Sequence, residues 1–258
     1  MLSYTNVSVT YDDAHVSLCD FSLLMKAGQI VALVGESGSG KTTAIRAAMG
    51  LLSGGGEVTG GDIRIDNRSL LGLNPNEWRT LRGRQMAMIF QDSGSMLNPI
   101  RTVGSQFVEY IRSHECISKR AAWQMGREMI AKMGLPHSEV TMKSYPFQLS
   151  GGMRQRVGIA MAMVFQPRIL LADEPTSALD VTTQAQIVCQ MLELREQYQT
   201  GILLVTHNLA MAAYMADHIL VMKGGRVVDQ GDRSYILTQS GCAYTHELLA
   251  AVPRMKGD

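Results

Sequence analysis

The sequence predicts an α/β fold in one large domain. Short runs of β-branched and apolar residues alternate with stretches of helical periodicity along the 258 residues, and such runs are typical of buried strands. One run, Ile30–Val34, precedes a glycine-rich turn, Gly35–Thr42, and then an alanine-rich stretch, Thr43–Ala48. A strand, a glycine-rich turn and a helix in this order direct several backbone N–H groups at one point, where a phosphate chain binds. We therefore expect the chain to bind a nucleoside triphosphate.

The other elements follow in order around this turn. Residues 1–65 alternate like antiparallel strands, and the glycines between 53 and 61 predict loops that lead into a short strand, Ile63–Ile65. From Gly94 to about Phe165 the apolar residues recur with a helical period. Further strands are predicted at Ile169–Ala172, Gly201–Val205, Ile219–Met222 and, after a turn at Lys223–Arg226, Val227–Gly231.

The residue types of the glycine-rich turn suit a phosphate site. Lys41 would reach the β- and γ-phosphates, and the Thr42 hydroxyl would ligate Mg²⁺. Glu36 is part of the loop, but we assign no chemistry to its side chain. The predicted nucleotide-binding residues of this segment are Gly35, Glu36, Ser37, Gly38, Ser39, Gly40, Lys41, Thr42 and Thr43.

A second anion site is predicted about 110 residues further on. Ser150, Gly151 and Gly152 precede a helical pattern, so a hydroxyl, backbone amides and the positive end of a helix dipole lie together. The alternative is an ordinary helix N-cap that happens to contain glycines.

Two acidic residues end the predicted strand at Ile169–Ala172. Asp173 would lie beside the phosphate loop and hold Mg²⁺, while Glu174 would polarise a water for attack on the γ-phosphate. Pro175 then stops the strand. The alternative is that both carboxylates only cap the strand.

These motifs resemble those of the ATP-binding subunits of ABC transporters over nearly the whole chain. Gly35–Thr42 matches the family's Walker A motif, Leu149–Gln155 its signature, and Ile169–Glu174 its Walker B with the catalytic glutamate. Three further matches are Gln91 as the sensor of Mg²⁺ and γ-phosphate, Ser177–Asp180 as the D-loop, and His207 as the switch histidine.

The resemblance implies a P-loop NTPase (RecA-like) core with an antiparallel β subdomain and an inserted α-helical subdomain. Residues 1–258 would form a single ABC ATPase domain. The helical subdomain would span about 94–165 and carry the signature, and a C-terminal tail would span about 232–258.

The resemblance also implies an ATPase that uses ATP and Mg²⁺. The catalytic residues would be Glu174, His207 and Lys41, and the metal ligands Thr42, Gln91 and Asp173. Ser150, Gly151 and Gly152 would close over the nucleotide of a partner subunit, and Gln155 would be a further nucleotide-binding residue. Tyr11 would stack on adenine; alternatively, it is only a tyrosine on an edge strand.

Composition narrows the cellular role. A net charge of +1 with 18% charged residues provides no broad basic face for nucleic acid. No apolar run approaches the roughly 18 residues that span a bilayer, and the N-terminal residues lack the pattern of a signal peptide. These features predict a cytosolic chain, and the resemblance implies that it attaches peripherally to the cytoplasmic face of the cell membrane.

Within the resembled family, a transporter motor is favoured over a soluble ABC ATPase, because the chain has no heptad run or basic tract. Ser93–Pro99, Tyr145–Gln148 and the tail Ala243–Pro253 resemble segments of the peptide/nickel/opine importers. Peptides, nickel and a metal–metallophore complex remain possible cargoes, and an importer of another small solute is the alternative.

The expected partners are membrane permease subunits, a sister ATPase chain and, indirectly, a solute-binding protein. A heterodimer of ATPase chains is favoured over a homodimer. The segment from Asp92 to Gln106 would connect the γ-phosphate sensor to a groove for a cytoplasmic helix of the permease, near Met96 and Ile100. The alternative is that these residues only pack the helical subdomain.

Overall fold

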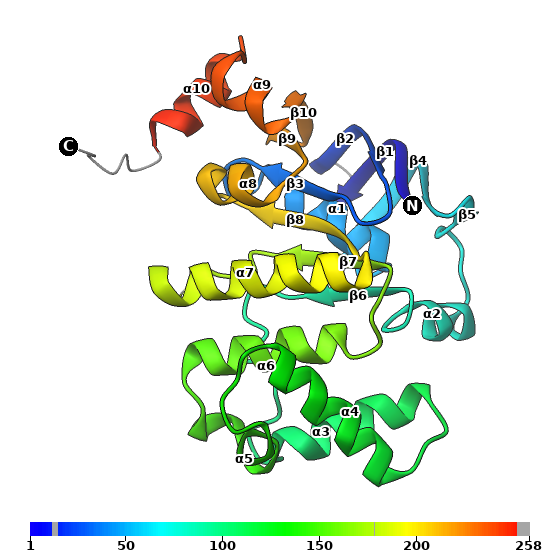
Figure 1. Ribbon diagram of the computed structural model, residues 1–258. Helices are drawn as coiled ribbons and strands as arrows, with labels where there is room; N and C mark the ends of the chain where they lie inside the picture. The colour runs from blue at the N-terminus through cyan, green and yellow to red at the C-terminus, as the bar shows by residue number, and fades with distance from the viewer. Residues whose placement is uncertain (12–14, 178, 252–258) are drawn as a thin grey trace, which may run out of the picture. The chain divides into compact units, whose positions relative to one another are not determined.

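The computed structural model describes residues 1–11, 15–177 and 179–251, which form two compact units (Figure 1). One unit contains residues 1–73 and the stretch that begins at Gly201, and the other is Asn74–Thr200. Three residues of the predicted motifs, Ala178, Val252 and Pro253, lie outside the described residues. Each unit is described by itself.

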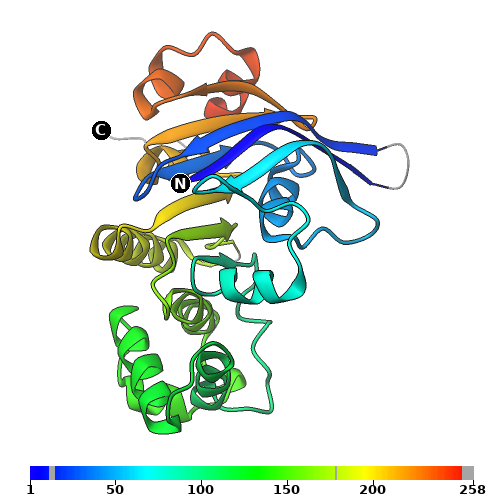
Figure 2. The ribbon, with the colours of Figure 1, turned by 90° about the vertical axis from the view of Figure 1, so that its right-hand side faces the viewer.

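The strands of the first unit belong to two sheets. They are β1 (Leu2–Tyr11), β2 (His15–Met25), β3 (Ile30–Val34), β4 (Glu57–Ile65), β5 (Arg68–Ser69), β8 (Gly201–Thr206), β9 (His218–Lys223) and β10 (Arg226–Gly231). The antiparallel sheet has the order β2-β1-β4-β5, and Figure 2 shows its three long strands side by side. In the other sheet, the strands of this unit have the order β10-β9-β3-β8.

The central strand β3 is parallel to both of its neighbours, β8 and β9. All five of its residues are fully buried, as expected for a strand whose two faces are both covered. The register pairs Val34 with Thr206, so β3 and β8 end at the same edge of the sheet. The residues that follow these two strands therefore lie near each other.

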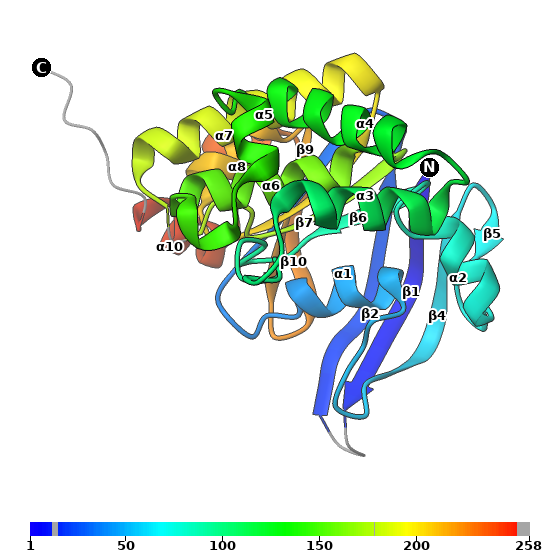
Figure 3. The ribbon, with the colours of Figure 1, turned by 90° about the horizontal axis from the view of Figure 1, so that it is seen from below.

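The helices of the first unit are α1 (Lys41–Met49), α8 (Leu209–Met215), α9 (Arg233–Thr238) and α10 (Ala243–Ala250). Helix α1 lies against β1 and β2 (Figure 3). The Tyr4 hydroxyl on β1 donates to the Ala44 carbonyl of α1 at 2.9 Å, and its ring meets Phe21 edge to face. Because Tyr4 is buried, its pKa is raised, and its proton stays available for this hydrogen bond.

The second unit combines two parallel strands with most of the helices. Its elements are α2 (Pro75–Leu81), β6 (Met86–Ile89), α3 (Val103–His114), α4 (Lys119–Lys132), α5 (Ser138–Lys143), a 3₁₀ turn η1 (Pro146–Gln148), α6 (Gly151–Met163), β7 (Ile169–Asp173) and α7 (Val181–Tyr198). Thr102, Ser118 and Ser150 cap α3, α4 and α6 through their side chains. No helix among the described residues has the length and apolar character to cross a bilayer.

The α/β class is confirmed, but the loop predicted before Ile63 is wrong. Strand β4 begins at Glu57 and contains both Gly60 and Gly61. Its register against β1 shifts between the pairs Thr5–Asp62 and Ser8–Gly60, which is a β-bulge. Gly61 adopts a φ of 77° there, so glycine allows the strand to continue through the irregularity rather than ending it.

The bulge gives a matched pair of glycine substitutions. A Cβ on Gly61 would lie 2.3 Å from the Thr5 carbonyl oxygen, whereas a Cβ on Gly60 would come no closer than 3.8 Å to Ser8. We expect Gly61→Ala to lower the free energy of unfolding by about 2 kcal/mol or more, because it adds a clash to a left-handed backbone. Gly60→Ala should change it by less than about 1 kcal/mol. Urea unfolding of both variants tests this; equal effects would contradict the assigned bulge.

Candidate nucleotide-binding site

The glycine-rich loop connects β3 to α1 as predicted and surrounds the Lys41 ammonium. Lys41 is only 6% exposed. Its Nζ donates to the Gly35 carbonyl at 2.7 Å, to the Glu36 carbonyl at 2.6 Å and to the Ser39 hydroxyl at 3.1 Å. The loop therefore holds a positive charge at the N-terminus of α1, where the helix dipole adds to it. This arrangement suits a polyphosphate.

The loop packs closely on β2, which restricts which residues it can contain. Gly40 has a φ of 96°, and a Cβ there would lie 2.5 Å from the Ser17 carbonyl oxygen. The Ser17 hydroxyl also lies 2.8 Å from the Thr43 hydroxyl on α1. Glycine at position 40 is therefore required both by its backbone conformation and by this close approach.

Two other predicted residues of the first unit, His207 and Tyr11, lie at the ends of strands. His207 directly follows β8, whose last residue pairs with the last residue of β3, and its side chain is exposed. Tyr11 ends β1 opposite His15, two residues from Ser17 on β2. A Cβ on Gly56 would lie 2.5 Å from the Tyr11 ring, so the ring packs closely against the Gly56 backbone.

The second unit brings Gln91 and Glu174 together at the ends of β6 and β7. These strands are parallel, with Ile89 opposite Ala172. The Ser177 hydroxyl lies within hydrogen-bond distance of the Gln91 carbonyl oxygen at 3.2 Å and of the Glu174 carbonyl oxygen at 3.0 Å. Ser177 therefore links the segment of the predicted sensor to that of the predicted catalytic glutamate. The sequence predicts Ser177 only as part of the D-loop, without this role.

Glu174 has a φ of 48°, which is unusual for a residue with a Cβ. A left-handed backbone at such a residue costs about 1 kcal/mol or more, and seven other non-glycine residues in the described part of the chain adopt it too. The preceding Asp173 is 4% exposed at the end of β7. The two carboxylates therefore differ in environment, one buried and the other half-buried.

The signature segment forms the start of α6. The Ser150 hydroxyl accepts a hydrogen bond from the Met153 amide at 3.3 Å, so it acts as an N-cap in this structure. Gln155 is buried, and its side-chain amide donates to the Pro175 carbonyl at 2.7 Å. Gly158 lies against Ser93, where a Cβ would approach to 2.5 Å. Helix α6 thus packs against both segments that follow β6 and β7.

Asp180, the last residue of the predicted D-loop, caps α7. Its carboxylate accepts from the Thr183 amide at 2.9 Å and from the Thr183 hydroxyl at 2.8 Å. These hydrogen bonds lower the pKa of the Asp180 carboxyl. The cap is therefore ionised at neutral pH, as suits a helix N-terminus.

Each unit therefore contains a different part of the predicted site. The first contains the phosphate loop, the end of β8 and the end of β1, and the second contains the sensor, the acidic pair and the signature. The contact of the loop with the C-terminal helix α10, through Tyr244 and Glu36, was not predicted. A separation of 208 residues leaves no local pattern that would predict it.

The two signature glycines provide a test of the packing on α7. A Cβ on Gly152 would lie 2.6 Å from the Thr183 methyl group, whereas a Cβ on Gly151 meets nothing within 4 Å. Thr183 cannot rotate away without losing its hydroxyl hydrogen bond to Asp180. We expect Gly152→Ala to be about 1 kcal/mol or more less stable than Gly151→Ala, measured as free energies of unfolding in urea. Equal stabilities would contradict the packing described here.

Comparison with known proteins agrees with this geometry. Residues 18–177 match the ABC transporter family. The oligopeptide transport ATP-binding protein OppD of Salmonella typhimurium is 40% identical over 261 residues, covering 100% of this chain and 78% of the relative. The dipeptide transport ATP-binding protein DppD of Haemophilus influenzae is 43% identical over 226 residues, covering 88% and 68%.

A solved structure shows the same fold. The ATP-binding cassette MJ0796, determined as a dimer in a post-hydrolysis state with ADP and phosphate, superimposes with a TM-score of 0.80 at 29% identity, covering 90% of this chain and 99% of that one. The P-loop NTPase fold and the ATPase activity expected from the sequence are thereby confirmed. The chain belongs to the ABC transporter family and is one of its ATP-binding, ATP-hydrolysing subunits.

Proposed function

We propose that this chain is the motor subunit of a membrane importer that takes up peptides. The observation that supports this most directly is the 40–43% identity, across most of the chain, to relatives named as oligopeptide and dipeptide transport proteins. The segments Tyr145–Gln148 and Ala243–Pro253 also support an importer, because they resemble segments of the peptide/nickel/opine group. Import of nickel or of a metal–metallophore complex is the competing outcome of the transport test below.

We assign ATP hydrolysis to Lys41, Glu174 and His207 because their side chains have the chemistry that this reaction needs. Lys41 neutralises charge on the β- and γ-phosphates from within the loop. Glu174 takes the proton of the attacking water as general base. His207, exposed at the end of β8, positions the water and the γ-phosphate, and Tyr11 stacks on adenine.

The oxygen donors predicted for Mg²⁺ have the right chemistry. Thr42 offers a hydroxyl, Gln91 an amide oxygen and Asp173 a carboxylate, and Mg²⁺ prefers oxygen ligands. A carboxylate as buried as that of Asp173 favours a nearby cation. When bound, Mg²⁺ would neutralise charge on the β- and γ-phosphates.

A second ATPase chain would complete the site. We assign Ser150, Gly151 and Gly152 to the nucleotide held by the partner, with a different sister chain favoured over a second copy. The buried Gln155 would instead join the signature to the segment after β7 through the Pro175 carbonyl. The dimeric state of the similar cassette MJ0796 supports association of two cassettes. Peripheral attachment to the cytoplasmic face of the membrane, through permease subunits, and indirect cooperation with a solute-binding protein follow from this assignment.

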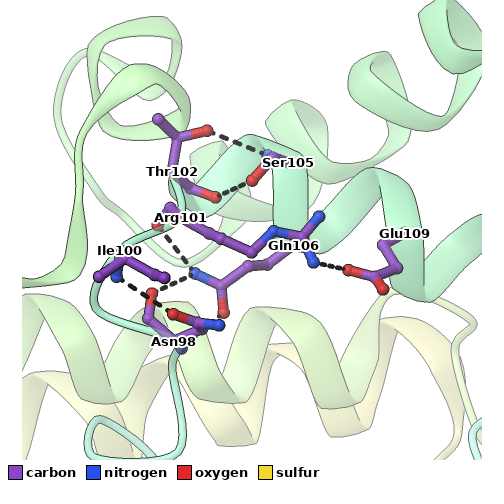
Figure 4. A network of polar contacts seen from close by, with 7 residues as sticks. All are labelled: Asn98, Ile100, Arg101, Thr102, Ser105, Gln106 and Glu109. Atoms are coloured by element: carbon purple, nitrogen blue, oxygen red, sulfur yellow. Dashed lines mark hydrogen bonds and ion pairs between the residues drawn. The ribbon is translucent and has the colours of Figure 1, made fainter.

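The segment before α3 is suited to receive a permease helix. Gln106 accepts from the Asn98 amide at 2.9 Å and donates to the Asn98 and Arg101 carbonyls, both at 3.1 Å (Figure 4). An ion pair joins Arg101 to Glu109. This network fixes the chain on both sides of Ile100, whose side chain is nevertheless 82% exposed. Met96, 63% exposed, adds a second apolar group in the same segment.

The proposed cargo and the role of Glu174 in ATP hydrolysis are tested in vesicles that contain the chain, its permeases, its sister ATPase and a solute-binding protein. We expect ATP-dependent peptide uptake, and we expect Glu174→Gln to keep ATP binding while slowing hydrolysis about 10²–10⁴-fold, the effect of losing a general base. Glu196→Gln, which changes an exposed carboxylate on α7, is the control. Uptake of nickel or a metallophore without peptide would contradict the proposed cargo, and wild-type turnover by Glu174→Gln would contradict the assigned base.

The permease contact is tested with Ile100→Glu. Because Ile100 is exposed, we expect the charge to leave the melting temperature unchanged and the basal ATPase activity within about twofold of wild type. Permease co-purification and uptake should fall at least about tenfold. Leu24→Glu, which alters another exposed apolar residue on β2, should leave uptake unchanged. Joint loss of stability and ATPase activity in Ile100→Glu would mean that Ile100 only packs its own unit.

A further inference from the structure

The C-terminal helix α10 touches the phosphate-binding loop directly. The Tyr244 hydroxyl accepts a hydrogen bond from the Glu36 amide at 3.1 Å, and the Tyr244 side chain is only 5% exposed. This contact joins residues 208 positions apart within the first unit. The C-terminal tail therefore contacts the predicted nucleotide site, which the sequence did not predict.

The same peptide group also holds Lys41. The amide that Tyr244 binds and the Gly35 carbonyl that accepts from Lys41 at 2.7 Å belong to one planar peptide unit. The N–H and C=O of a trans peptide point in opposite directions, so a hydrogen bond at one end orients the group at the other. Tyr244 therefore fixes the direction of a carbonyl that positions the Lys41 ammonium.

The Tyr244 ring is itself held in place. Lys223 Nζ lies 4.3 Å from the centroid of the ring, a cation–π contact. The next residue, Thr245, is fully buried and donates its hydroxyl to the Asp229 carboxylate on β10 at 2.6 Å. Ser240 donates to the same oxygen of Asp229. The start of α10 is thus tied to β10, and the tyrosine hydroxyl is presented to the loop from a rigid support.

We propose that Tyr244 is a positioning residue for nucleotide binding, which acts through the Gly35–Glu36 peptide on Lys41. The tail helix then tunes the affinity of the phosphate loop for ATP without touching the reacting atoms. Loss of the hydroxyl frees the peptide to rotate and the ammonium to move. Binding of the triphosphate weakens as a result, while the general base on the other unit is untouched. The expected signature is a larger change in the KM for ATP than in kcat.

The test compares Tyr244→Phe, which keeps the ring and removes only the hydroxyl, with wild type as the full chain. The probe is a fluorescent ATP analogue with Mg²⁺, and its Kd should rise about 2- to 10-fold, the range set by one neutral hydrogen bond. The KM for ATP should rise in parallel, with kcat within about twofold. Tyr214→Phe, which alters an exposed tyrosine on α8, is the matched control and should change neither constant.

The outcomes separate this inference from the proposed function on which it rests. Failure of the wild-type chain to bind the analogue contradicts the nucleotide site itself. Wild-type binding with an unchanged Kd in Tyr244→Phe overturns the role of Tyr244 alone, as does a fall in kcat without a change in KM.

A second variant covers the case in which Tyr244→Phe loses stability. Lys223→Met removes the cation beside the ring from an exposed position and leaves the hydroxyl in place. We expect it to raise the Kd by a smaller factor, about 1.5- to 3-fold, at an unchanged melting temperature. An unchanged Kd in Lys223→Met, together with a melting temperature lowered in Tyr244→Phe, would show that the tyrosine only packs the tail.

Discussion

The hydrogen bonds of the Lys41 ammonium with the carbonyls of Gly35 and Glu36 are the interaction on which the nucleotide site depends. A buried ammonium must be surrounded by oxygen atoms, because an unpaired charge in the interior is very costly. The loop meets this requirement by turning its own carbonyls inward, which in turn needs the backbone conformations that glycine permits at Gly40 and its neighbours. The close approach to β2 and the contact with α10 then follow from where this loop must lie.

The segments around the predicted site of the second unit are joined by weaker contacts. Neutral hydrogen bonds from Ser177 and Gln155 join the segments that follow β6, β7 and the start of α6. Each such bond contributes only about 1 kcal/mol, so the arrangement is suited to shift when a ligand favours another state. The phosphate loop is thus organised around one buried charge, whereas Ser177 and Gln155 join segments of the second unit through neutral hydrogen bonds.

The sequence predicted the elements whose signals are local. The β3–loop–α1 unit and strand β7, which ends at Asp173 just before Glu174, were predicted to within one or two residues. A buried apolar run bounded by glycine or acidic residues can be recognised in a short window. The continuation of β4 through Gly60 and Gly61 was missed, since its cause is a register shift against β1 and not a property of the glycines. The contacts of Tyr244 with Glu36 and of Ser177 with Gln91 were missed for the same reason, as they join residues far apart in the chain.

The left-handed backbone of Glu174 has a consequence for how this protein can change over evolutionary time. A glycine at that position would relieve the conformational cost, so selection for stability alone would favour losing the glutamate. A chain that keeps a long acidic side chain there gives up stability at the one place where we assign the carboxylate to hydrolysis. In a duplicated copy that no longer has to hydrolyse ATP, replacement of Glu174 by glycine would therefore raise stability and remove hydrolysis in a single substitution. Such a copy would suit the inactive subunit of an asymmetric pair.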